Sequence, residues 1–158
     1  MSTTNYAGFW LRFVAVIIDG LIVGAIQFII IMPILGLFGI NMAMNMDDGN
    51  MSDEQAMATA FAAMGAAGSI TIVAGLASIL YFTIMEASKF QATFGKLALG
   101  LKVTDMNGNP LDFGKALLRN LGKIVSGMIL YIGYIMAGFT DKKQALHDMI
   151  AGALVVKK

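Results

Sequence analysis

The sequence contains no cysteine, two prolines, one histidine and little charge of either sign. Without cysteine the chain cannot form disulfide bonds or a cysteine-ligated zinc site. Charged residues make up 13% of the chain and the formal net charge is +1. A soluble domain would be about 25% charged, and a nucleic-acid-binding domain would normally show a marked basic excess. These absences argue against a disulfide-stapled secreted domain, a nucleic-acid-binding protein and a soluble monomer.

Apolar residues instead dominate the 158-residue chain, at 58% of its composition. Residues 13–40 contain a single charge, Asp19, and residues 56–85 contain none. Because about 20 apolar residues span a bilayer core, the sequence predicts a transmembrane hairpin with helices at about 10–40 and 56–85. A third apolar stretch, 124–139, would reach only about 24 Å as a helix, short of the ~30 Å core. It either spans a thinned bilayer or enters and returns.

The charges between these stretches predict the orientation. The connection 41–55 contains four acidic residues and no lysine or arginine, whereas region 86–123 contains six basic residues and the tail 140–158 contains four more. Short loops rich in lysine and arginine stay in the cytoplasm. The N-terminus, region 86–123 and the tail are therefore expected inside, and loop 41–55 outside. A cytoplasmic tail favours a re-entrant third segment, whereas hydropathy favours a third span, so both alternatives stay open.

Region 86–123 also contains short patterns typical of soluble structure. Leu101–Asp105 alternates in polarity and precedes a turn signal, and Ala153–Lys157 is a candidate partner strand. Residues 112–123 repeat apolar positions at helical spacing, with the cations Lys115, Arg119 and Lys123 elsewhere. This predicts a basic amphipathic helix lying in the cytoplasmic interface. The predicted fold is an all-α membrane protein: a two-helix hairpin, a short third hydrophobic segment, this amphipathic helix and a small β-ribbon.

Asp19 is the candidate functional residue within the first helix. An aspartate at the centre of a membrane helix costs about 2.5–3.5 kcal/mol on insertion scales, so it needs a protein or water environment. One interpretation is an ion- or proton-binding carboxylate. The other is a structural acid, neutralised by Arg12, which lies seven residues away on the same helix face, or by a cation on another helix. Glu86, at the end of the second helix, and Asp148 are further candidate charge partners.

Two other patterns are compatible with ordinary packing. Gly20 and Gly24 form a GxxxG motif, and Gly75 belongs to a row of small residues in the second helix, so these glycines are candidates for close helix packing. Thioethers suit Cu(I), which makes the external methionines a weak metal candidate, although methionine also fills apolar surfaces generally. These methionines are Met42, Met44 and Met46. Because no catalytic motif is present, we expect neither enzymatic activity nor a cofactor.

Several short motifs occur in a familiar order along the chain. They are Gly8-Phe-Trp-Leu-Arg12 with Ile18-Asp19, Thr93-Phe-Gly-Lys96, Gly100-Leu-Lys-Val-Thr-Asp105, Leu118-Arg-Asn120 and Leu146-His-Asp148. Together they resemble the RDD family of small bacterial membrane proteins, named for one arginine and two aspartates. The resemblance implies that residues 1–158 form a single domain. It implies that Arg12 is the family arginine, Asp19 the first aspartate, and Asp148 or Asp105 the second.

The resemblance implies a multi-pass protein of the bacterial inner membrane, with the lipid bilayer as its partner. Some relatives are described as cation/proton antiporters, which favours small-cation/proton transport at Asp19. Two or three helices can hardly enclose a path, so transport would require a homo-oligomer. The alternative is a non-transporting scaffold or accessory subunit that presents a basic cytoplasmic face to an anionic lipid or to a protein partner of unknown identity.

Overall fold

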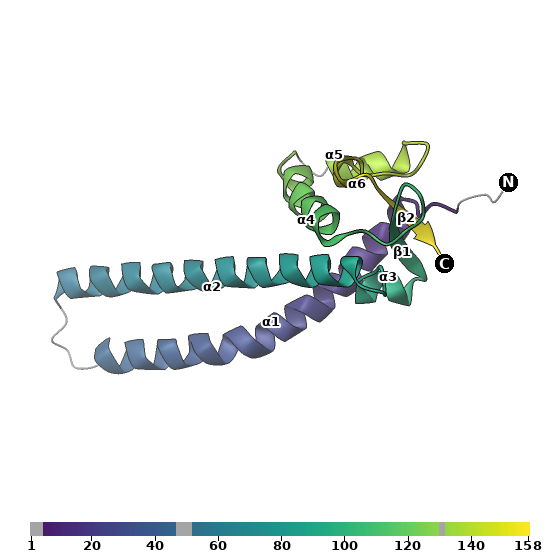
Figure 1. Ribbon diagram of the computed structural model, residues 1–158. Helices are drawn as coiled ribbons and strands as arrows, with labels where there is room; N and C mark the ends of the chain where they lie inside the picture. The colour runs from purple at the N-terminus through teal and green to yellow at the C-terminus, as the bar shows by residue number, and fades with distance from the viewer. Residues whose placement is uncertain (1–4, 47–51, 130–131) are drawn as a thin grey trace. The chain divides into compact units, whose positions relative to one another are not determined.

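The computed structural model describes residues 5–46, 52–129 and 132–158, which belong to two compact units (Figure 1). We call the unit that contains the chain up to Leu21 and again from Ser78 to Lys158 the terminal unit. Residues 22–77 form the hairpin unit. The two long helices run through both units, and the candidate site lies wholly in the terminal unit.

The two long helices are α1, Phe9–Met46, and α2, Asp53–Ala87. Both are long and apolar enough to cross a membrane, which confirms the two predicted transmembrane helices. Each is longer than the sequence predicted, so the connection between them is shorter than the expected 41–55. Within the hairpin unit the side-chain amide of Gln27 donates to the carbonyl of Ala74 at 3.1 Å.

The predicted packing glycines do not bring helices together in the structure. A Cβ atom added to Gly20, Gly24 or Gly75 would meet no described atom within 4 Å outside its own helix backbone. Within the single chain these glycine faces therefore have open space beside them, and their close packing against a helix of a second copy stays a prediction. The methionine motif also differs from the prediction, since Met42 and Met44 belong to α1 rather than to a loop. Residues two apart on a helix point to different faces, so these two thioethers do not converge; the side chain of Met46 lies outside the described residues.

Seven short elements complete the terminal unit. They are α3 (Phe94–Ala98), β1 (Leu101–Asp105), α4 (Phe113–Met128), α5 (Ile132–Ile135), the 3-10 helix η1 (Met136–Gly138), α6 (Leu146–Ala151) and β2 (Ala153–Lys157). The strands pair antiparallel with Val103 opposite Val155, which confirms the predicted ribbon. On the other edge of β2, the N–H of Ala7 donates to the carbonyl of Val155 at 2.8 Å. Alternate strand residues and the small side chains of α1, α4 and α6 form the apolar core of this unit.

The third hydrophobic segment is bent. The axis of α4 and that of the following Ile132–Gly138 helices differ by 118°. The strand before this segment, β1, pairs with the strand after it, β2. The segment therefore leaves from and returns to the same small sheet, as a re-entrant segment would.

Helix α4 faces the opposite way from the prediction. Asp112 caps its first turn by accepting from the N–H of Lys115 at 2.8 Å. Its buried face carries Ala116, Arg119, Asn120, Gly122 and Ser126. Its exposed face is apolar and includes Phe113, Leu118, Leu121, Ile124, Val125 and Met128. The expected basic outer face is wrong here, because Arg119 and Lys123 turn inward to buried carboxylates. An apolar exterior of this kind is expected to contact lipid or protein.

Candidate functional site

Asp19 caps a short helix instead of standing open to an ion. It lies on α1 with 1% of its surface exposed. Its two carboxylate oxygens accept hydrogen bonds from the hydroxyl of Thr93 and from the backbone N–H of Gly95, the latter at 2.8 Å. Thr93 directly precedes α3, and its own side chain makes no cap. The carboxylate of Asp19 therefore satisfies one free N–H group at the start of α3, that of Gly95, while the N–H of Phe94 donates to the hydroxyl of Tyr81 at 3.3 Å.

Gly95 makes this contact sterically feasible. A Cβ atom at Gly95 would lie 2.2 Å from the backbone oxygen of Ala15 and 2.9 Å from Cγ of Asp19. Ala15 is fully buried at the same place. The start of α3 thus lies directly on the backbone of α1, and only glycine fits there without displacing one of the two helices.

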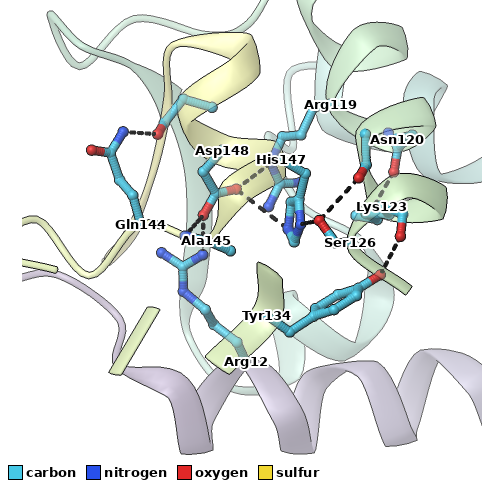
Figure 2. Close-up of polar contacts among 12 residues, drawn as sticks. Arg12, Arg119, Asn120, Lys123, Ser126, Tyr134, Gln144, Ala145, His147 and Asp148 are labelled. Carbon is cyan, nitrogen blue, oxygen red and sulfur yellow. Dashed lines mark hydrogen bonds and ion pairs between the residues drawn. The ribbon is translucent and has the colours of Figure 1, made fainter. Parts of the chain in front are cut away.

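Asp148 is held between two arginines (Figure 2). Its side chain is fully buried on α6, where one oxygen pairs with Nη1 of Arg12 and the other accepts from Nε of Arg119 at 2.7 Å. The N–H of Ala145 also donates to this carboxylate, at 3.1 Å. Burial alone would raise the pKa of Asp148, but attraction to Arg119 and Arg12 outweighs it and holds the pKa well below its usual range. Asp148 is therefore a permanently charged anchor.

Arg12 uses its remaining donors on the backbone of the terminal unit. Its Nε donates to the carbonyl of Ala7 at 2.9 Å and its Nη2 to that of Lys143 at 2.6 Å. Its partner is Asp148 rather than Asp19, because two helical turns separate Arg12 and Asp19 by roughly 10 Å of rise. Arg12 thus ties the start of α1 to the loop before α6.

Glu86 forms ion pairs with Lys96, Arg119 and Lys123. It is fully buried at the end of α2, and its Oε1 forms ion pairs with Nη1 of Arg119 at 2.6 Å, with Lys96, and with Lys123 at 3.5 Å. Its Oε2 accepts from the side-chain amide of Asn120 at 3.2 Å. Burial lowers the pKa of Lys96, and the charge of Glu86 partly opposes that shift. Arg119 thereby links Glu86 to Asp148, and we call these residues the charge cluster: Arg12, Glu86, Lys96, Arg119, Lys123 and Asp148.

His147 lies beside the charge cluster but is neutral. Its Nδ1 is 3.2 Å from the hydroxyl of Ser126, and its ring packs against Tyr134 (Figure 2). Ser126 is fully buried, and its hydroxyl also lies 3.0 Å from the carbonyl of Gly122, to which it can donate. Burial, and then the charge of Arg119, lower the pKa of His147 to about 3. His147 and Ser126 therefore form a buried polar pair, and Tyr134 adds a ring contact.

A cavity of about 290 Å³ opens between these residues. Four cations line it, namely Arg12, Lys96, Arg119 and Lys123, together with Asp19, His147 and several apolar side chains. Glu86 and Asp148 lie behind the cations. Among the described residues, no group of three or more histidine, cysteine, aspartate or glutamate side chains is placed to hold a metal ion. Among the residues that line the cavity, the four cations outnumber the one carboxylate, Asp19, which favours an anion over a cation.

Similarity to known proteins identifies the family. The sequence profile of the RDD family matches residues 6–152. The chain belongs to the RDD family. It is 37% identical to the protein YxaI of Bacillus subtilis (strain 168) over 152 residues, which cover 96% of this chain and 97% of YxaI. It is 28% identical to the membrane protein YteJ of the same organism over 158 residues, covering 99% and 84% of the two chains.

A weaker similarity covers part of the RDD domain. The Proline-rich antigen homolog of Mycobacterium tuberculosis (strain ATCC 25618 / H37Rv) is 27% identical over 85 residues, covering 53% of this chain and 35% of that protein. No solved structure matches this RDD-family chain. With two candidate spans and these relatives, the chain is a membrane protein of the RDD family.

The structure brings together three of the four charged residues that the sequence singled out in this RDD-family chain. Arg12, Glu86 and Asp148 all belong to the charge cluster, whereas Asp19 lies at the α3 cap. Asp105, the other candidate for the second family aspartate, is exposed and caps its own turn through the N–H groups of Asn107 and Asn109.

Sequence reasoning missed the residues that connect these groups. Arg119 was assigned to the basic face of an amphipathic helix and Lys96 to a basic loop, and Thr93 and Gly95 were given no role. One signal could have found them, because each lies in one of the short family motifs.

Proposed function

We propose that this RDD-family protein is a membrane-anchored scaffold, without transport or enzymatic activity, in the bacterial inner membrane. The observation that carries the proposal is the hydrogen bonding of Asp19, whose two oxygens both bind donors of this chain. In this function α1 and α2 anchor the terminal unit, the charge cluster holds that unit together, and Asp19 fixes α3 to α1.

Cation/proton exchange at Asp19 is the competing function, and two features disfavour it. A cation at Asp19 would compete with the Gly95 N–H and the Thr93 hydroxyl for the charge of the carboxylate, and so would weaken the cap of α3. The cavity beside Asp19 is also lined by four cations, which repel an entering cation in a low-dielectric site. The homo-oligomer that transport would require is not needed by a scaffold.

The scaffold would act at the cytoplasmic face. In the proposed topology the start of α1 and the end of α2 lie on the same side of the membrane, and the positive-inside rule favours the cytoplasm for that side. Several lysines of the terminal unit are exposed, and they would attract anionic lipid headgroups at about 1 kcal/mol each near the surface. They include Lys89, Lys115, Lys142, Lys157 and Lys158.

Proton flux in proteoliposomes tests the proposal. Wild type, Asp19→Asn and the control Asp53→Asn, an exposed acid at the start of α2, would be reconstituted and exposed to inward Na⁺ and K⁺ gradients. We expect no cation-dependent proton flux from any of the three. Asp19→Asn should instead lower the free energy of unfolding by about 1 kcal/mol, as a lost helix cap does, and Asp53→Asn should not. Cation-dependent flux in wild type that Asp19→Asn abolishes without unfolding would overturn the proposal.

A further inference from the structure

We infer that the cavity of the terminal unit binds the oxyanion head of an anionic phospholipid, with the lipid chain along its apolar wall. The inference rests on the proposed scaffold function and names a ligand for the terminal unit. It comes from the juxtaposition of four cations that line the cavity with an apolar wall that reaches the outer surface of α1.

The charge balance of the cavity favours an anion. Four cations line it, and within the described part of the chain three buried carboxylates lie against them, namely Asp19, Glu86 and Asp148. When all four cations are protonated, one positive charge is thus left without a carboxylate. Burial lowers the pKa of Lys123 to about 7, and an oxyanion beside it would favour its charged form. Both arginines already pair with carboxylates: Arg12 with Asp148, and Arg119 with both Asp148 and Glu86. An uncompensated buried charge is costly, and an oxyanion in the cavity would balance it.

Lys123 is the cation best placed to receive that oxyanion. Its Nζ donates to Oδ1 of Asn120 at 2.5 Å and is 3.5 Å from Oε1 of Glu86. That glutamate oxygen already forms ion pairs with Lys96 and Arg119. Since an ammonium group has three donors, Lys123 retains a donor for a ligand. Its side chain is 21% exposed, whereas that of Arg119 is 2% exposed.

The apolar part of the cavity lining reaches the outer surface of α1. Phe9, Phe13 and Val16 belong to it, and Phe13 and Val16 are 46% and 53% exposed on α1. Phe82 also lines the cavity, with Nζ of Lys123 4.7 Å from the centroid of its ring. Trp10, 74% exposed, packs its ring against Phe9 and Phe13. Tryptophan is enriched where acyl chains meet headgroups. A ligand that enters past these residues would therefore carry a charged head and an apolar chain, which describes an anionic phospholipid better than a soluble anion.

Quenching of the single tryptophan tests the inference, because Trp10 borders this wall. The full chain in dodecylmaltoside micelles would be titrated with a brominated phosphatidylglycerol, and separately with a brominated phosphatidylcholine at the same micellar fraction. We expect half-maximal quenching by phosphatidylglycerol at a fraction at least tenfold lower. Equal quenching by the two lipids would overturn the inference, and this comparison needs no variant.

Two variants on the same helix place the binding site. Lys123→Gln should weaken phosphatidylglycerol quenching at least tenfold, whereas Lys115→Gln, an exposed lysine of α4, should leave it within twofold. Equal losses in both would indicate surface attraction only and would overturn the inference. Circular dichroism checks that each variant folds, and Val16→Phe, which narrows the cavity without a change of charge, replaces Lys123→Gln should that variant not fold.

Inorganic phosphate distinguishes the two sources of the oxyanion. Phosphate at 100-fold excess over the lipid should displace the brominated phosphatidylglycerol by less than twofold if the chain contributes to binding. Complete displacement would assign the cavity to a free anion and overturn the lipid. The proposed scaffold fails on a different result, cation flux in proteoliposomes, so the two proposals can fail separately.

Discussion

At the scale of single residues, Arg119 is the side chain whose loss should cost the most stability. It is 2% exposed and is the bridge between the two buried carboxylates, Glu86 and Asp148. Removing one partner of a buried ion pair leaves an uncompensated charge, at a cost of roughly 3–5 kcal/mol. We therefore expect Arg119→Gln to lower the free energy of unfolding by about that amount, measured by denaturant titration in detergent.

The control substitution for Arg119→Gln is at Lys115, one turn earlier on the same helix. Lys115→Gln removes an equal charge from an exposed position, where Lys115 forms an ion pair with the exposed Asp112 at 3.9 Å. Exposed pairs of this kind contribute about 0–1 kcal/mol. A similar loss of stability in both variants would mean that the cluster is not the source of stability that its geometry indicates.

His147 should make stability depend on pH in the mildly acidic range. Burial and the charge of Arg119 lower its pKa to about 3 in the folded protein, whereas an unfolded histidine titrates near 6.5. Between these values the unfolded chain binds the additional proton, so acidification favours unfolding. Asp148 also has a lowered pKa, and its stabilising contribution is full above the unfolded aspartate value of about 3.9 and is lost only at lower pH.

The variant His147→Gln separates this effect from other titrations. From pH 7 to pH 5 we expect the wild type to lose about 2 kcal/mol more of its free energy of unfolding than His147→Gln does. Denaturant midpoints at the two pH values, in the same detergent, measure the difference. Parallel losses in wild type and variant would show that His147 is not held neutral by burial.

At the scale of elements, the contact between α3 and α1 depends on one glycine. In Gly95→Ala the new methyl group would lie 2.2 Å from the backbone oxygen of Ala15. Because backbone cannot move aside cheaply, we expect a loss of about 3 kcal/mol or more, the upper end for overpacking. Gly20→Ala, with no described atom within 4 Å, should be neutral or gain up to about 1 kcal/mol of helix propensity. Thermal unfolding of both variants measures the contrast, and a tolerated Gly95→Ala would contradict this packing.

The elements themselves could largely be predicted from the sequence. Long uncharged stretches predict α1 and α2 because only helices satisfy their backbone in lipid. Alternation at Leu101–Asp105 and Ala153–Lys157 predicts the ribbon that the structure contains. The outward face of α4 could not be predicted, because periodicity shows that a helix has two faces but not which one meets water. In this chain the polar face meets buried carboxylates from α2 and α6.

The candidate site could be predicted only in part, for a related reason. A charge in an apolar segment predicts that a partner exists, and this singles out Arg12, Asp19 and Glu86. It does not say which partner, since Thr93 lies 74 residues from Asp19 along the chain and Asp148 lies 136 residues from Arg12. Those pairings depend on how α3 and α6 fold back onto the ends of α1 and α2.

At the scale of the whole molecule, the small sheet limits the paths open to the third hydrophobic segment. β1 precedes that segment and β2 follows it, yet the two strands are paired. Strands that share hydrogen bonds must lie on the same side of a bilayer. Tyr6 forms a bridge to Val156 as well, so the start of the chain lies beside the same sheet. We therefore predict two crossings, by α1 and α2, and a third segment that returns to the side from which it left.

Single-cysteine labelling tests this topology directly, because the chain contains no cysteine of its own. Ser52→Cys lies at the start of α2, Asn109→Cys lies in the loop after β1, and Lys158→Cys follows β2; all three positions are exposed. In intact cells an impermeant maleimide should label Ser52→Cys alone, since basic loops stay in the cytoplasm. After permeabilisation it should label all three, which controls for reactivity. Labelling of Lys158→Cys without Asn109→Cys in intact cells would mean that the third segment crosses, and the pairing of β1 with β2 could then not exist in the membrane.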